Sequence, residues 1–71
     1  MLTLLRLAAA NKTEYDVFRN KNNNFCCLEH DFGSPMIQDA SIDDACDWLL
    51  RSGVQAKKEE LTALLSKLVL N

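Results

Sequence analysis

Residues 15–30 decide the fold, and they read YDVFRNKNNNFCCLEH. Two runs rich in aromatic and other β-favouring residues, 15–19 and 25–30, flank a five-residue turn with four asparagines. Asparagine tolerates the left-handed backbone better than other non-glycine residues, so the stretch predicts a β-hairpin. A turn of this length would place one group of side chains on a single face: Phe18, Cys26, Leu28 and His30. A slip of one residue would regroup them, so the register stays open.

The segment before the hairpin favours a short helix. Residues 3–10 consist mostly of strong helix formers, with Thr3 as an N-cap and Asn11 where a left-handed C-cap residue would lie. Leu5 and Leu7 would equally suit a strand, because a helix this short depends on tertiary packing.

After the hairpin, Gly33-Ser34-Pro35 ends the second strand, and Met36-Ile37 is long enough only for a short third strand at the sheet edge. A helix then starts at Ser41, an N-cap residue followed by two aspartates in the first turn. Gly53 ends this helix as the residue after its C-cap. Its apolar stripe consists of Ile42, Ala45, Cys46, Leu49 and Leu50.

A last helix is predicted from Gln55 or Ala56 to about Leu70. Leucines repeat along one side of it, at positions 61, 64, 65 and 68. The predicted order is therefore α-β-β-(β)-α-α, an α+β fold of two layers. A β-hairpin, or a three-stranded antiparallel sheet, packs against two to three helices. At 71 residues the chain has room for a single domain, 1–71.

Charge is unevenly distributed along the chain. The net charge is +2 over residues 1–28, −6 over 29–50 and +2 over 51–71. The middle block contains no basic residue, and this is more negative charge than helix capping requires. If its carboxylates gather on one face, they can steer the protein toward a basic surface; otherwise they form a solvated face. The residues concerned are Glu29, Asp31, Asp39, Asp43, Asp44 and Asp47.

Trp48 lies beside the apolar stripe of its helix rather than within it. Tryptophan is enriched among the residues that dominate binding energy at interfaces, so Trp48 is a candidate anchor next to the acidic residues. The alternative is a residue at the edge of the core, covered by the first or last helix.

Several functional classes receive no support. The basic residues are scattered rather than clustered, which argues against direct nucleic-acid binding. No segment approaches the about 20 apolar residues of a membrane span, and the first ten residues lack the length of a secretion signal. The sequence contains no phosphate-binding glycine motif and no nucleophile elbow. We therefore expect a protein that is not an enzyme and binds no cofactor.

Three cysteines and one histidine form a weaker candidate site: Cys26, Cys27, His30 and Cys46. Neighbouring residues in a strand face opposite ways, so Cys26 and Cys27 suit neither a shared zinc ion nor a disulfide framework. The alternative is that Cys46 and one hairpin cysteine fill the core, while His30 pairs with a carboxylate at a strand end. Unpaired thiols favour a reducing compartment, the cytoplasm.

The sequence thus predicts a small regulator or inhibitor that binds a protein partner through an acidic face. Such a face could occupy a nucleic-acid-binding surface on that partner, because carboxylates would stand where phosphates bind. Two alternatives remain: a structural homodimer formed through the leucine-rich last helix, and a metal or thiol site at the cysteines.

Overall fold

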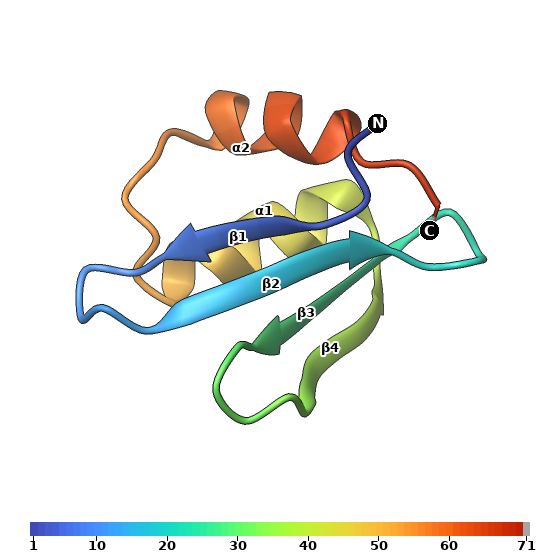
Figure 1. The fold of residues 1–71 in the computed structure, drawn as a ribbon. Helices are drawn as coiled ribbons and strands as arrows, with labels where there is room; N and C mark the ends of the chain where they lie inside the picture. Colours follow the sequence, from blue (N-terminus) through green and yellow to red (C-terminus); the bar gives the residue numbers. More distant parts are fainter. Residues whose placement is uncertain (71) are drawn as a thin grey trace.

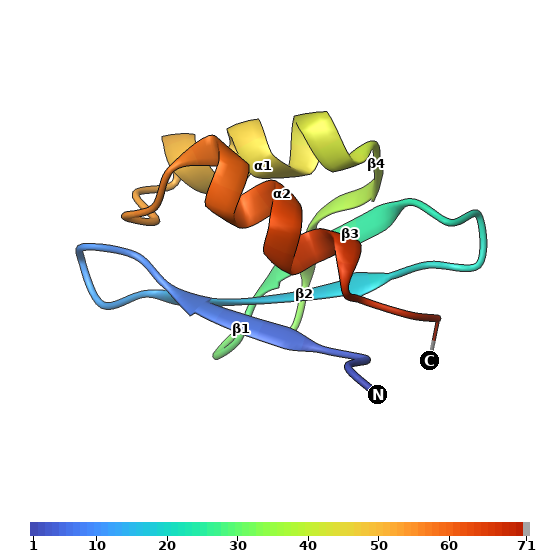
Figure 2. The ribbon, with the colours of Figure 1, turned by 90° about the horizontal axis from the view of Figure 1, so that it is seen from above.

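The computed structural model describes residues 1–70. Four strands precede two helices, and the strands form one antiparallel sheet in the order β1-β2-β3-β4. Both helices cover the same face of this sheet, which gives two layers (Figures 1 and 2). The elements are β1 (Leu5–Ala8), β2 (Glu14–Arg19), β3 (Phe25–Glu29), β4 (Pro35–Ala40), α1 (Ile42–Arg51) and α2 (Lys58–Ser66).

The α+β class is confirmed, but the predicted order α-β-β-(β)-α-α is wrong, because the chain follows β-β-β-β-α-α. Residues 5–8 form an edge strand instead of part of a helix, and they pair with β2. Leu5 and Leu7 face Val17 and Tyr15 and pack against the core. Helix propensity is a weak preference, and pairing with β2 outweighs it over so short a segment.

The predicted hairpin is confirmed, and its register places Phe18 opposite Cys26 across a turn of residues 20–24. Asn20 holds this turn, since its Oδ1 accepts hydrogen bonds from the backbone N–H groups of Asn22 and Asn24 at 3.0 and 2.9 Å. Asn23 adopts a positive φ of 65°. The asparagines therefore stabilise the turn in the way their residue type predicts.

The predicted third strand corresponds to β4. It is longer than the predicted Met36-Ile37, because β4 begins at Pro35 and continues to Ala40. Its pairing with β3 is interrupted by two register shifts, one between the partners of Phe25 and Cys27 and one between those of Cys27 and Leu28. Near the first of these shifts, the carbonyl of Gln38 accepts hydrogen bonds from the side chains of Asn20 and Cys26. These contacts come from the hairpin and extend β4 beyond what its own sequence indicates.

The start and end of α1 are as predicted. The Oγ of Ser41 accepts a hydrogen bond from the backbone N–H of Asp44 at 3.1 Å. At the other end, Gly53 has a φ of 103°, and the N–H groups of Gly53 and Val54 donate to the carbonyls of Leu50 and Leu49. This is the Schellman pattern, which needs a residue that tolerates positive φ. The predicted apolar stripe is also confirmed, because all its members are buried or pack against the core.

The last helix is shorter than predicted. It ends at Ser66, and residues 67–70 continue as an irregular segment that bridges to Leu2, before β1, and to Arg19, at the end of β2. The N–H of Val69 donates to the carbonyl of Leu2 at 2.9 Å. Leu61, Leu65 and Leu68 enter the core between helices and sheet, so the leucine stripe is largely buried inside the protein.

Arg19, at the end of β2, contacts three parts of the chain: the segment after α2, the hairpin turn and the start of β3. Its Nε donates to the carbonyl of Leu68 at 2.8 Å, and one terminal nitrogen donates to the Oδ1 of Asn23 at 2.9 Å. The guanidinium carbon lies 4.5 Å from the centre of the Phe25 ring. The side chain therefore fastens the segment after α2 to the hairpin turn.

Candidate functional site: an acidic groove between β4 and α1

A groove of about 400 Å³ lies between the edge strand β4 and helix α1. Residues 37–40 of the strand and one side of the helix line it. Residues 44, 48 and 51 are spaced by four and three positions, which brings their side chains to the same side of α1. The lining residues are Ile37, Gln38, Asp39, Ala40, Asp44, Trp48 and Arg51.

Trp48 is half-buried, and its contact at the edge of the core is with β2, whereas the predicted first helix that could cover it does not form. Its ring meets Tyr15 edge to face, with ring centres 5.1 Å apart and an angle of 84° between the planes. This contact fixes the indole at the edge of the core. The remaining surface of Trp48 lines the groove, so the same side chain is available to a ligand.

Asp39 enters the groove from β4, and the hairpin turn holds its carboxylate. The side-chain amides of Asn20 and Asn24 donate to its Oδ1 at 2.7 and 3.0 Å. These hydrogen bonds, that from Asn20 above all, lower the pKa of Asp39 from its ordinary value. The carboxylate is therefore kept charged and oriented.

Asp43 and Asp47 lie beside the groove and are partly neutralised by α2. The Nζ of Lys58 lies 2.7 Å from an oxygen of Asp43 and 2.9 Å from one of Asp47, and both contacts raise the pKa of Lys58. Residues 29–50 contain no basic residue, but the fold places Lys58 of α2 against two of their carboxylates. Asp44 takes part in none of the ion pairs found among residues 1–70.

The carboxylates of Asp43, Asp44 and Asp47 lie within 4.8 Å of one another. Among the described residues, this is the single cluster of three side chains close enough together to share a metal ion. The ammonium group of Lys58 already lies against two of them. The arrangement is an ion-paired helix surface, and it gives no further indication of a bound cation.

Glu29 and Asp31 are separated from the other predicted site residues. Glu29 is the last residue of β3, whereas Phe25, at the opposite end of that strand, pairs with Ala40 at the groove. Four residues of strand span about 13 Å. The structure therefore brings Asp39, Asp43, Asp44, Asp47 and Trp48 to one side and leaves Glu29 and Asp31 near the β3–β4 turn.

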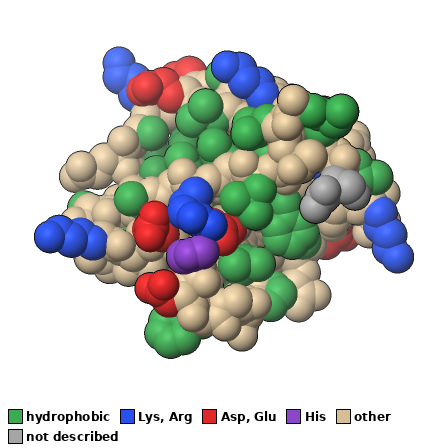
Figure 3. All heavy atoms as spheres, viewed as in Figure 1, with side chains coloured by type: hydrophobic (Ala, Val, Ile, Leu, Met, Phe, Trp, Pro, Cys, Tyr) green, Lys and Arg blue, Asp and Glu red, His purple; other side chains and the backbone are tan. Residues whose placement is uncertain are grey.

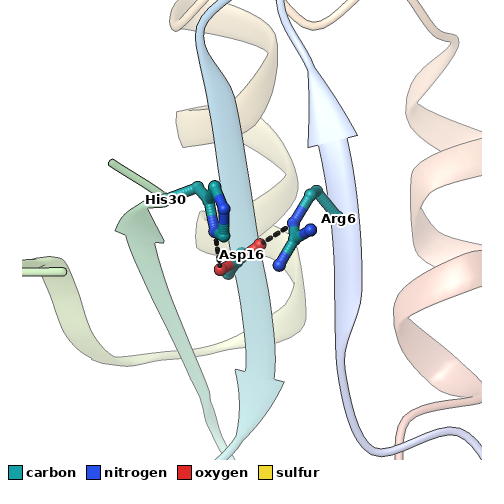
Figure 4. A network of polar contacts seen from close by, with 3 residues as sticks. All are labelled: Arg6, Asp16 and His30. Atoms are coloured by element: carbon teal, nitrogen blue, oxygen red, sulfur yellow. Dashed lines mark hydrogen bonds and ion pairs between the residues drawn. The ribbon is translucent and has the colours of Figure 1, made fainter. Parts of the chain in front are cut away.

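A second polar feature lies on the sheet face that the helices leave uncovered (Figures 3 and 4). Asp16 accepts a hydrogen bond from the Nε of Arg6 at 2.7 Å, and its other oxygen lies 2.9 Å from the Nδ1 of His30. Asp16 is only 6% exposed, although it points away from the helices, because its two partners cover it. The predicted pairing of His30 with a carboxylate is thus confirmed.

Two opposing effects act on the Asp16 carboxyl group. Burial raises its pKa, but the hydrogen bonds from Arg6 and His30, together with the positive charge of Arg6, outweigh burial, so the pKa lies below its ordinary value. An apolar residue, Leu28, lies opposite Asp16 in the sheet. Sequence analysis did not single out Arg6 and Asp16, since their approach depends on β1 being a strand.

The cysteines are distributed between the two sides of the sheet. Cys27 and Cys46 are fully buried in the core, as expected for small apolar residues, and burial raises the pKa of Cys27 to about 12. Cys26 points to the other side, where its Sγ lies 2.7 Å from the carbonyl oxygen of Gln38. The fold does not bring these thiols and His30 to one point within residues 1–70.

The homodimer alternative depends on the leucine-rich last helix, with Val69 and Leu70 widening its apolar stripe. Leu61, Leu65 and Leu68 lie inside the core, whereas Val69 and Leu70 are exposed. Self-association remains a prediction. No helix in the described part of the chain is long and apolar enough to cross a membrane.

Comparison with protein families, with curated proteins and with solved structures finds no match to this chain. The geometry of the groove is therefore the basis for a functional proposal.

Proposed function

We propose that this protein is a non-enzymatic interaction module that binds a basic protein partner through the groove between β4 and α1. The observation that carries the proposal is the grouping of Asp39, Asp44 and Trp48 around one groove of about 400 Å³. Two carboxylates beside an aromatic ring suit a lysine or arginine side chain, because the charge meets an opposite charge and the aliphatic part packs on the ring.

Charge supports a partner with a basic surface. Asp39 and Asp44 line the groove together with one basic residue, Arg51, and Asp43 and Asp47 stand beside it with Lys58 as their counter-charge. Negative potential on one side of a small protein speeds encounter with a positive surface and disfavours acidic partners. A protein surface that otherwise binds nucleic acid belongs to this class of partner. The three unpaired cysteines favour a cytoplasmic setting for the interaction.

The test is capture of partners by the immobilised protein over a series of salt concentrations, followed by mass spectrometry. We expect Asp39→Asn combined with Asp44→Asn to weaken capture about tenfold, which corresponds to about 1.4 kcal/mol. The asparagine at position 39 can still accept hydrogen bonds from the turn, so the fold is retained.

The matched control removes the same number of charges elsewhere, through Asp31→Asn combined with Glu59→Gln. Both residues are exposed and neither lines the groove. If both double variants lose capture equally, binding depends on overall charge rather than on this groove, and the proposal is wrong. Unchanged capture by the Asp39/Asp44 variant would also overturn it.

A further inference from the structure

We infer that the groove receives an extended peptide segment, which adds to the sheet as a fifth strand beside β4. This inference rests on the proposed function and specifies how the partner binds. An edge strand presents backbone N–H and C=O groups that can pair with another chain. When an extended segment pairs in this way, backbone hydrogen bonds provide affinity and side-chain contacts provide specificity.

The two edges of the sheet differ in the backbone partners that other parts of the chain supply. At the β1 edge, Ala9 forms a bridge with Val54, and Leu2 forms one with Leu68, so both ends of that edge have partners. No strand or bridge among residues 1–70 pairs with β4 on the side away from β3. The groove lies along β4 and α1, over residues 37–40 of the strand.

The side of α1 that faces the groove indicates the chemistry of the peptide. Asp44, Trp48 and Arg51 follow one another along the helix, and seven residues of helix span about 10 Å. Alternate side chains of an extended strand point the same way and are about 6.6 Å apart, so three of them cover a similar length. A basic residue next to Asp44, an apolar residue next to Trp48 and an acidic residue next to Arg51 would match the groove.

The irregularity in β4 fits this role. Bulges occur next to binding sites, where they redirect a side chain. Here one of the two register shifts lies between Phe25 and Cys27, opposite the part of β4 that lines the groove, and the other lies between Cys27 and Leu28. Asp39 leaves this part of the strand with its carboxylate fixed by Asn20 and Asn24. The charged side chain is therefore oriented before a ligand arrives.

The probe is a fluorescent, end-capped peptide with the sequence Ser-Lys-Thr-Val-Thr-Glu-Ser, together with its reverse, because a strand can add in either direction. Anisotropy titrations would measure binding to the protein and to the Asp44→Asn variant. A second pair of probes is N-methylated at every second amide, once in each phase. N-methylation retains the side chains and their charges but removes the donors that a strand needs.

Strand addition predicts that one peptide direction binds, that N-methylation in one phase weakens it at least tenfold, and that Asp44→Asn weakens it as well. The amides of residues 37–40 should also gain protection from hydrogen exchange. If both N-methylated probes bind as well as the parent while Asp44→Asn still weakens binding, strand addition is refuted and the acidic groove stands. If no probe binds, strand addition by a peptide of this pattern is refuted, whereas the capture experiment still decides the proposed function.

Discussion

Replacing Arg19 by alanine removes the side chain that connects the hairpin turn with the segment after α2. In the native protein its Nε donates to the Leu68 carbonyl at 2.8 Å, and one terminal nitrogen donates to the backbone carbonyl and Oδ1 of Asn23 at 3.1 and 2.9 Å. Its contact with the carbonyl of Leu65, at 3.5 Å, is at the limit of a hydrogen bond and adds little.

The magnitude follows from these contacts. A hydrogen bond from a charged donor contributes about 1.5–3 kcal/mol, and the pair at Asn23 falls below that range because it is exposed. Placement of the guanidinium over the Phe25 ring adds about 0.5–1 kcal/mol. We expect Arg19→Ala to lower the free energy of unfolding by about 3 kcal/mol. The melting temperature of a domain this small should then fall by about 12–24 °C.

Urea and thermal unfolding, followed by circular dichroism, measure this loss. Arg19→Met retains an aliphatic stem above Phe25 but no donor, so it separates packing from hydrogen bonding and should recover only a minor part of the stability. Arg51→Ala is the control, because Arg51 is exposed and takes part in none of the ion pairs of residues 1–70. A loss below about 1 kcal/mol for Arg19→Ala would refute the reasoning, since it would leave little beyond the about 0.5 kcal/mol that a surface substitution without such contacts can cost.

Three further predictions concern single residues. The pKa of Asp16 is lower in the folded than in the unfolded state, so its stabilisation is present above about pH 4 and is lost as the pH falls further; urea midpoints measured from pH 7 to 3 should fall more steeply for the native protein than for Asp16→Asn, and parallel curves would contradict this. Lys12 has a φ of 72°, a strained value for lysine, so Lys12→Gly should raise stability by about 0.5 kcal/mol, and a lower urea midpoint would argue against that strain. Ellman's reagent should leave Cys27 and Cys46 unmodified in the folded protein and label all three thiols in denaturant, because both side chains are fully buried; rapid labelling of two or more thiols without denaturant would show that the core opens.

The elements that could be predicted from sequence are those with local signals. The asparagine turn, the Ser41 cap and the Gly53 end each depend on a few neighbouring residues, and all three are confirmed. Residues 5–8 could not be assigned in this way, because their local preference is helical and the deciding interaction is pairing with residues 14–17. The end of the last helix could not be predicted for the same reason. Residues 67–70 leave the helix because they form hydrogen bonds and bridges with Leu2 and Arg19, which are distant in the sequence.

The candidate site was only partly predictable for similar reasons. Asp44 and Trp48 share a helix face, and their spacing alone places them together. The strand side of the groove required β4 to extend to Ala40, and the neutralisation of Asp43 and Asp47 required Lys58 to approach from another helix. The pairing of Arg6 with Asp16 follows from cross-strand register, so a search for opposite charges would find it only after residues 5–8 are read as a strand.

The order of the strands in the sheet has a consequence for how the molecule folds. Each strand pairs with its neighbour in the chain, so the loops that must close during folding are short and their entropic cost is low. The contacts of residues 67–70 with Leu2 and Arg19 span most of the chain and form few hydrogen bonds. We therefore expect this segment to dock last during folding, after the hairpin has formed.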